Sequence, residues 1–142
     1  MIEFLKHWFA ALVVGLEEVD ETAREAILSA CGRACAHSYT AEMFCRVRAQ
    51  SASMDEFLAA LGKVFPEAAY ELIAPGKIRV RYGFCACDLV KLGLLTSPLL
   101  CRCSVHNLRE NFERALHGPV EVTLEASILE GAPQCAFLVR LT

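Results

Sequence analysis

The sequence has no excess of basic residues. Lysine and arginine total 14 against 17 aspartate and glutamate residues, so the formal net charge at pH 7 is -3. Proteins that bind nucleic acid present a basic face to the phosphates, and this charge balance argues against nucleic acid as the main partner. The sequence also lacks a phosphate-binding loop, a catalytic triad and a pair of carboxylates placed for acid–base catalysis. The usual sequence signatures of nucleic-acid-binding proteins and of these kinds of enzyme are therefore missing.

The apolar run near the N-terminus is too short to span a bilayer. It covers residues 8–16, whereas a transmembrane helix needs about 20 apolar residues. Acidic residues follow the run and no small-residue cleavage site closes it, so it does not resemble a secretion signal. Its apolar side chains fall on one helical stripe, formed by Ile2, Leu5, Phe9, Leu12, Val13 and Leu16. We therefore expect a core-packing helix, no membrane attachment and a cytoplasmic location.

Helices are expected to fill the first half of the chain. The first should cover residues 2–18, and Asp20 is placed to cap a second helix that reaches about residue 35. A further helical stretch is expected at residues 39–47. Ser53 and Glu56 have the spacing of a capping box before a short helix that ends near Gly62.

The second half of the chain changes to the alternating pattern of strands. Residues 70–82 alternate apolar and polar side chains around a turn at residues 74–76, which predicts a hairpin with one buried face. An apolar, irregular connection follows at residues 89–100. It holds too many leucines for a solvated loop, so we expect it to fold over a pocket or to form a dimer contact.

A second hairpin is expected at the C-terminus. Ser104 is placed to cap a helix that runs to His117, and residues 120–128 and 135–141 show strand alternation. The order of elements contains no βαβ unit, so the strands should be antiparallel. The sequence predicts a single α+β domain in which N-terminal helices pack on an antiparallel sheet built from two hairpins, with one helix between the hairpins.

Cysteine is present in unusual number, with eight residues among 142. Four of the eight form two Cys-x-Cys pairs, Cys85 with Cys87 and Cys101 with Cys103. The hydrophobic content of 55% is enough to form a core that needs no disulfide bonds for its stability. In a reducing compartment, clustered cysteines are more often ligands or reactive thiols than disulfides. Thiol chemistry is therefore the first candidate for any chemistry of this chain.

Both pairs have a spacing that can place two sulfurs side by side. Residues i and i+2 of a strand point to the same side, so Cys85 and Cys87 would present their thiols together if the preceding strand continues. Cys101 and Cys103 come just before a predicted helix, whose N-terminus lowers thiol pKa values. Four such sulfurs predict a site for zinc or, as a second candidate, an iron–sulfur cluster. Inert packing and reactive thiols are the alternatives.

Four further residues could complete that site or line a pocket. Cys31 and Cys35 lie one turn apart on a helix face, and Gly32 between them would let another backbone or a ligand approach closely. His37 could join them in a second site, and His106 is a reserve ligand three residues after Cys103. Packing in the core is the competing interpretation of Cys31 and Cys35.

These motifs resemble those of a known group of proteins. The motif Cys-Gly-Arg-x-Cys at residues 31–35, the two Cys-x-Cys pairs, the stretch 120–131 and the final Cys-Ala-Phe at 135–137 are similar to a cysteine-rich bacterial and archaeal family. That family is related to 4-vinyl reductase domains and to L-2-amino-thiazoline-4-carboxylic acid hydrolase-like proteins. The resemblance covers about residues 20–142. It implies an α+β domain that binds small molecules, with zinc held by cysteines in 4-vinyl reductase members.

The sequence thus predicts a cysteine-rich domain that binds or senses a small molecule and carries a thiolate metal site. One alternative is a hydrolase of a small cyclic amide or thiazoline, in which Cys101 or Cys103 would be the nucleophile or a metal ligand. A second alternative is a structural or interaction domain with buried, inert thiols. The expected partners are a small-molecule ligand and a second copy in a homodimer, without nucleic acid or membrane.

Overall fold

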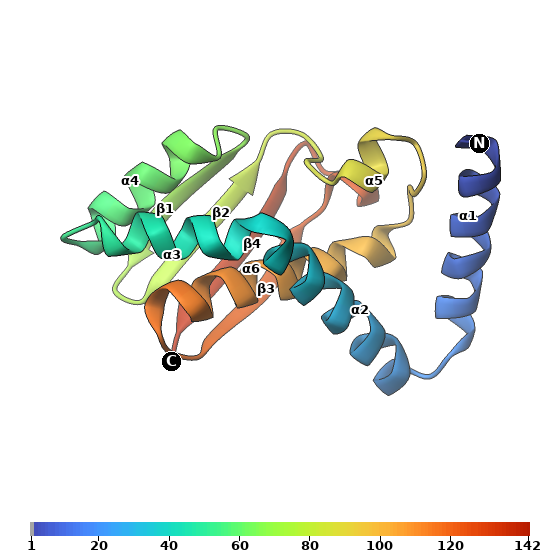
Figure 1. The fold of residues 1–142 in the computed structure, drawn as a ribbon, viewed down its shortest axis with the longest axis horizontal. Coiled ribbons are helices and arrows are strands. Elements are labelled where there is room, and N and C mark those ends of the chain that lie inside the picture. Colours follow the sequence, from blue (N-terminus) through green and yellow to red (C-terminus); the bar gives the residue numbers. More distant parts are fainter. Residues whose placement is uncertain (1) are drawn as a thin grey trace.

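The computed structural model describes residues 2–142, with helices in the first half and a sheet in the second (Figure 1). The elements of the first half are α1 (Ile2–Glu18), α2 (Glu21–Cys35), the π-helical turn η1 (Ala36–Thr40), α3 (Ala41–Ala49) and α4 (Met54–Val64). Those of the second half are β1 (Ala68–Ala74), β2 (Lys77–Tyr82), α5 (Asp88–Lys91), η2 (Pro98–Leu100), α6 (Cys101–Leu116), β3 (Val120–Ala126), η3 (Ile128–Glu130) and β4 (Cys135–Leu141). The predicted α+β class is confirmed.

The sheet is built from two hairpins that meet at their second strands. Its strand order is β1-β2-β4-β3, and every neighbouring pair is antiparallel. At the central pair, Val80 lies opposite Phe137 and Ile78 lies opposite Val139. Gly76 closes the first hairpin with a φ of 71°, a left-handed conformation that glycine adopts without strain. Helix α6 connects the two hairpins, as the sequence predicts.

The helices cover one face of this sheet (Figure 1). The covered face carries apolar side chains, and Ile78, Val80 and Val139 there are fully buried. The other face carries ion pairs between strands, including Arg79 Nε to Glu125 Oε1 at 3.0 Å. This division follows from the period of two in the strands, because alternate side chains point to opposite faces.

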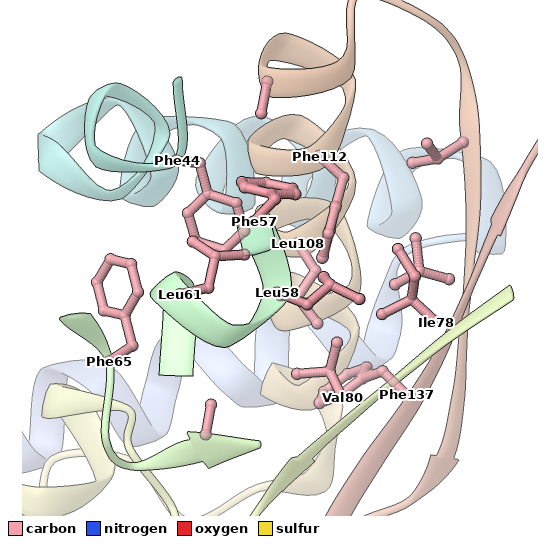
Figure 2. Close-up of a cluster of buried hydrophobic side chains, with 14 of the residues drawn as sticks. Phe44, Phe57, Leu58, Leu61, Phe65, Ile78, Val80, Leu108, Phe112 and Phe137 are labelled. Atoms are coloured by element: carbon pink, nitrogen blue, oxygen red, sulfur yellow. The ribbon is translucent and has the colours of Figure 1, made fainter. Parts of the chain in front are cut away.

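Phenylalanine rings fill the space between helices and sheet (Figure 2). Phe44 of α3, Phe57 of α4 and Phe112 of α6 are at most 2% exposed. The Phe44 and Phe112 ring centroids lie 5.3 Å apart in an edge-to-face arrangement, and those of Phe57 and Phe112 lie 6.3 Å apart. Such pairs contribute about 0.5–1.5 kcal/mol each beyond their buried area. The core is therefore a filled aromatic cluster.

Helices α2 and α3 follow one another without a loop, joined by η1, and the helix axis changes direction where they meet (Figure 1). A π-helical turn inserts extra backbone into an α-helix and changes which side chains share a face. Helix α2 contacts α6 before this turn, and α3 contacts α6 after it. At the turn, Thr40 Oγ1 donates a hydrogen bond to Asn111 Oδ1 of α6 at 3.1 Å. The turn thus keeps both helices against α6.

Helix α1 has the predicted bounds, but the prediction that its stripe packs in the core is wrong for most of its residues. Of the predicted stripe only Leu16 is buried; Ile2 and Leu12 are 44% and 42% exposed, and Leu5, Phe9 and Val13 are half-buried. Periodicity shows which face could be buried, but the chain path decides whether another element covers it. Here Arg24 of α2 donates hydrogen bonds to the carbonyl oxygens of Leu16, Glu17 and Val19. This contact fixes a turn that directs α1 away from the sheet (Figure 1).

The apolar connection at residues 89–100 folds against the rest of the molecule. Leu94 and Leu95 are 8% and 5% exposed, whereas Leu92 is 60% exposed. The turn at Gly93 lies beside the aliphatic part of Lys6 of α1. Within residues 2–142, no helix has both the length and the apolarity needed to cross a bilayer.

Candidate functional site

Neither Cys-x-Cys pair lies on a strand. Strand β2 ends at Tyr82, so Cys85 and Cys87 lie in the loop that precedes α5, where the Cys85 thiol accepts a hydrogen bond from the Cys87 backbone. Helix α6 begins at Cys101 and not after Ser104, which places Cys101 and Cys103 inside its first turn. Positions two apart on a helix point in nearly opposite directions, so Cys101 and Cys103 face different neighbours.

One member of each pair joins the two cysteines of α2. Cys31, Cys35 and Cys87 lie near the Cys103 thiol, and Cys35 also lies beside Asn107 of α6. We call Cys31, Cys35, Cys87 and Cys103 the α2–α6 thiol cluster. Cys31 and Cys35 are exposed and the other two are half-buried, so solvent reaches this cluster. The sequence named all four residues but not this grouping.

The other members join Cys135 of β4 in a more buried group. Cys85 and Cys135 lie near Cys101. The Cys101 Sγ and Ser127 Oγ atoms share a hydrogen bond at 3.0 Å, and Cys135 Sγ accepts one from the Ile128 backbone N–H at 3.4 Å. These contacts tie the start of α6 to η3 and β4. This group has the character of packed structural thiols.

The predicted thiolate centre was tested against the side-chain positions. Among residues 2–142, no three His, Cys, Asp or Glu side chains are arranged to hold a metal ion. Cys85 and Cys101 lie in one group and Cys87 and Cys103 in the other. The side chains as they stand do not form a preformed zinc or iron–sulfur centre, and binding of either remains a prediction.

Burial makes the cysteine thiols of α6 weaker acids. Loss of solvation, together with Cys31, Cys35 and Cys87, raises the pKa of Cys103 to about 12. Burial also raises the pKa of Cys101, with Ser127 opposing the shift. The predicted lowering of these pKa values by the helix N-terminus is therefore outweighed by desolvation. A neutral thiol is a poor nucleophile, so the hydrolase alternative gains no support here.

Gly32 brings α2 and α6 into direct backbone contact. A Cβ atom built at Gly32 would lie 2.6 Å from His106 Cβ and 3.0 Å from the Asn107 backbone nitrogen, and would also collide with the Cys103 carbonyl oxygen. Only glycine has no atom at that position. The expectation that Gly32 admits a close approach is confirmed, and the approaching group is the α6 backbone.

The two candidate histidines bind carboxylates and not cysteines. His37 Nε2 lies 2.8 Å from Glu110 Oε1. His106, which is 9% exposed, hydrogen-bonds through Nε2 to Glu25 of α2. Both pairs bridge α2 and η1 to α6. The reserve-ligand role expected for His106, and a second site of His37 with Cys31 and Cys35, stay predictions.

A groove of about 1120 Å³ lies along the outer side of α6. Helix α2 forms one wall, the edge strand β3 forms the other, and Pro98 and Leu99 lie at one end. Its lining combines apolar side chains with the His106–Glu25 pair and with Arg102 and Arg109. We call this feature the α6 groove.

The sequence analysis missed the α6 groove except for His106. Its lining comes from α2, η2, α6, β3 and η3, segments far apart in the sequence, and no local pattern joins them. The apolar connection at residues 89–100 was the only signal, because it was expected to fold over a pocket. Pro98 and Leu99 do line the groove.

Comparison of the sequence with protein families gives one match over residues 4–142, to a family described as a family of unknown function (DUF6144). The match covers nearly the whole chain, so the chain belongs to this family. No functionally curated protein matches the sequence. The resemblance to 4-vinyl reductase and thiazoline hydrolase-like proteins gains no support from these matches.

The solved structures that share the fold include the following two. One is a trafficking protein particle complex subunit 3 from Naegleria fowleri covalently bound to palmitic acid, with a TM-score of 0.61, 15% identity, and coverage of 99% of this chain and 95% of that one. The other is the phenol-responsive sensory domain of the transcription activator PoxR with phenol, with a TM-score of 0.55, 17% identity, and coverage of 94% and 74%. Identities this low show a shared fold and nothing finer.

Proposed function

We propose that this chain is a small-molecule-binding domain whose ligand lies in the α6 groove. The observation that carries the proposal is the buried His106 side chain, which Glu25 holds at the floor of a large groove. Ligand sites are concave, mostly apolar and furnished with a few fixed polar groups. The shared fold adds support, because one structural neighbour was solved with palmitic acid and the other with phenol.

The lining of the groove indicates the kind of ligand it would bind. Val105 of α6, Leu124 of β3 and Leu99 of η2 offer an apolar surface. Arg102 and Arg109 lie on the same side of α6, one turn before and after Val105 and His106. Arg102 already pairs with Glu21 and Arg109 with Glu113, so a ligand carboxylate would compete with protein carboxylates for them. A small molecule with an apolar body and a hydroxyl group fits these features.

Binding can be tested with phenol and palmitate as separate probes. Titration of isotope-labelled protein should shift the backbone NMR signals of the groove residues on α2 and α6. Ala26 is exposed and lines the groove, so Ala26→Trp fills the space without removing a buried contact. We expect this variant to weaken binding by about tenfold or more, which corresponds to about 1.4 kcal/mol.

A control on the same helix separates blocking of the groove from a general effect. Ala34 of α2 is also exposed but does not line the groove, and Ala34→Trp should leave the affinity unchanged. The proposal fails if neither probe gives saturable shifts, or if the shifts gather outside the α6 groove. Equal affinities of the two variants would also contradict it.

A further inference from the structure

The α2–α6 thiol cluster lies on the opposite side of the Gly32 contact from the groove. Groove residues of α2 such as Glu25 and Ser29 face one side of the crossing, while helical periodicity places Cys31 and Cys35 on the other. On α6, Arg102 and His106 line the groove, and Cys103 and Asn107 lie toward the cysteines. The two features are thus distinct sites on one helix pair.

The four cysteines of the cluster come from three segments. Cys31 and Cys35 belong to α2, Cys103 to α6, and Cys87 to the loop that leads into α5. The Gly32 contact brings the α2 backbone against the Cys103 carbonyl oxygen. The Cys103 side chain therefore leaves its backbone close to the residues that flank Gly32 on α2. Because Cys31 and Cys35 are exposed, their side chains can change rotamer without displacing core atoms.

The cluster offers pairs of thiols but not a closed metal site. A structural zinc site takes four ligands, whereas among residues 2–142 no three His, Cys, Asp or Glu side chains are arranged to hold a metal ion. Cys31 and Cys35 lie one helical turn apart, and the Gly32 contact places Cys103 against the same stretch of α2. A ligand that forms covalent bonds to two thiols needs only one such pair.

We propose that the α2–α6 thiol cluster is a binding site for a soft ligand that bridges two of its thiols, and that trivalent arsenicals are the class that fits. In each step an As–OH group condenses with one Cys S–H group. An As–S bond forms, the As–O bond breaks, and the thiol proton leaves in a water molecule. No electrons are exchanged, so the step needs neither an oxidant nor a reductant.

Phenylarsine oxide is the probe, because its arsenic atom bonds to two thiols at once. The reduced full-length protein should retain one phenylarsenic group through excess glutathione, a monothiol, and release it to 2,3-dimercaptopropanol. Intact-mass analysis measures both steps. We expect Cys103→Ser to shorten the lifetime of the adduct in glutathione by about a hundredfold, at the lower end of the gain that a second linked contact provides.

Matched variants decide which thiols bind. Cys45 of α3 belongs to neither group, and Cys45→Ser should leave the adduct unchanged. Cys135→Ser, which removes a buried member of the other group, should also leave it unchanged. Loss of the adduct with Cys135→Ser, or its survival with Cys103→Ser, would overturn the proposal, as would easy removal of the adduct by glutathione.

Peptide mapping keeps the test independent of the folding of variants. Trypsin cleaves after Arg33 and Arg102, so Cys31 and Cys103 fall on separate peptides that bound arsenic would link. Linked peptides that contain Cys101 or Cys135 instead would place the site in the wrong group. Titration with Zn²⁺ is a second experiment. If zinc binds tightly, Cys103→Ser abolishes that binding, and no stable arsenical adduct forms, the proposal is overturned and the cluster is a zinc site.

Discussion

Gly32 is the residue that most directly controls the arrangement of both candidate sites. Glycine in a helix interior costs about 1 kcal/mol relative to alanine, so its presence in α2 requires a compensating contact. That contact is the α6 backbone at Cys103 and Asn107, which occupies the space of a Cβ atom. A side chain at this position would push apart the two helices that carry the groove and the thiol cluster.

We predict that Gly32→Ala destabilises the fold although alanine is the better helix former. The added Cβ would collide with helix backbone, which cannot move aside as a flexible side chain can, and overpacking of this kind typically costs about 1–3 kcal/mol. The free energy of unfolding, measured with urea, should fall.

Gly15 of α1 provides the matched control. It also lies in a helix, but a Cβ atom there would meet no atom within 4 Å. Gly15→Ala should leave stability unchanged or raise it by up to about 1 kcal/mol. If both substitutions have the same effect, the close contact of α2 and α6 is not the reason for Gly32.

Helix α1 shows how an element can have the predicted bounds and still lack the predicted environment. The chain contains one tryptophan, Trp8, and it lies 54% exposed on α1. Its indole contacts the ring of Phe9, with centroids 5.4 Å apart, but Trp8 itself remains open to solvent. The tryptophan fluorescence therefore reports on α1 alone.

We predict that acrylamide quenches the Trp8 fluorescence of dilute protein efficiently, because the indole is accessible. The homodimer expected from the sequence can be tested in the same experiment. If a second copy covers α1, quenching should weaken as the protein concentration rises, and sedimentation should show a larger species over the same range. Strong protection of Trp8 at every concentration would contradict the exposed position of α1.

At the scale of the whole molecule, burial keeps several weakly acidic side chains protonated. Besides Cys103, burial raises the pKa values of Tyr70 and Tyr82, whose phenols also lie near one another. All three pKa values lie above those of the unfolded chain, about 8.5 for cysteine and 10 for tyrosine. The folded state therefore retains protons that the unfolded state releases in alkaline solution.

We predict an alkaline loss of stability with a defined sign. Each group contributes fully below its unfolded pKa, and its contribution disappears as the pH rises from that value toward the folded pKa. The free energy of unfolding should be level from pH 7 to about 8.5 and should then fall up to pH 11. Cys103→Ala and Tyr82→Phe should each make this fall less steep. A slope unchanged in both variants would show that these groups are not the cause.

Local sequence signals account for much of the fold. Asp20 caps α2 by accepting a hydrogen bond from the Ala23 N–H at 2.8 Å, as its position predicts. Ser53 accepts a hydrogen bond from the Glu56 N–H at 3.2 Å, although Gly62 does not end α4, which continues to Val64. The alternation of apolar and polar side chains along the strands predicted which face of the sheet is apolar. These features depend on neighbours within a few residues, so one sequence is enough to determine them.

Contacts between distant segments decided the candidate sites. The sequence determined that Cys85, Cys87, Cys101 and Cys103 form two close pairs along the chain, but the end of β2 at Tyr82 and the start of α6 at Cys101 decided which thiols meet. A shift of four residues in the start of α6 changes which of its residues are helical, and burial then opposes the effect of the helix N-terminus on the pKa values of Cys101 and Cys103. Helix boundaries and desolvation both depend on packing, and packing exists only in the folded chain.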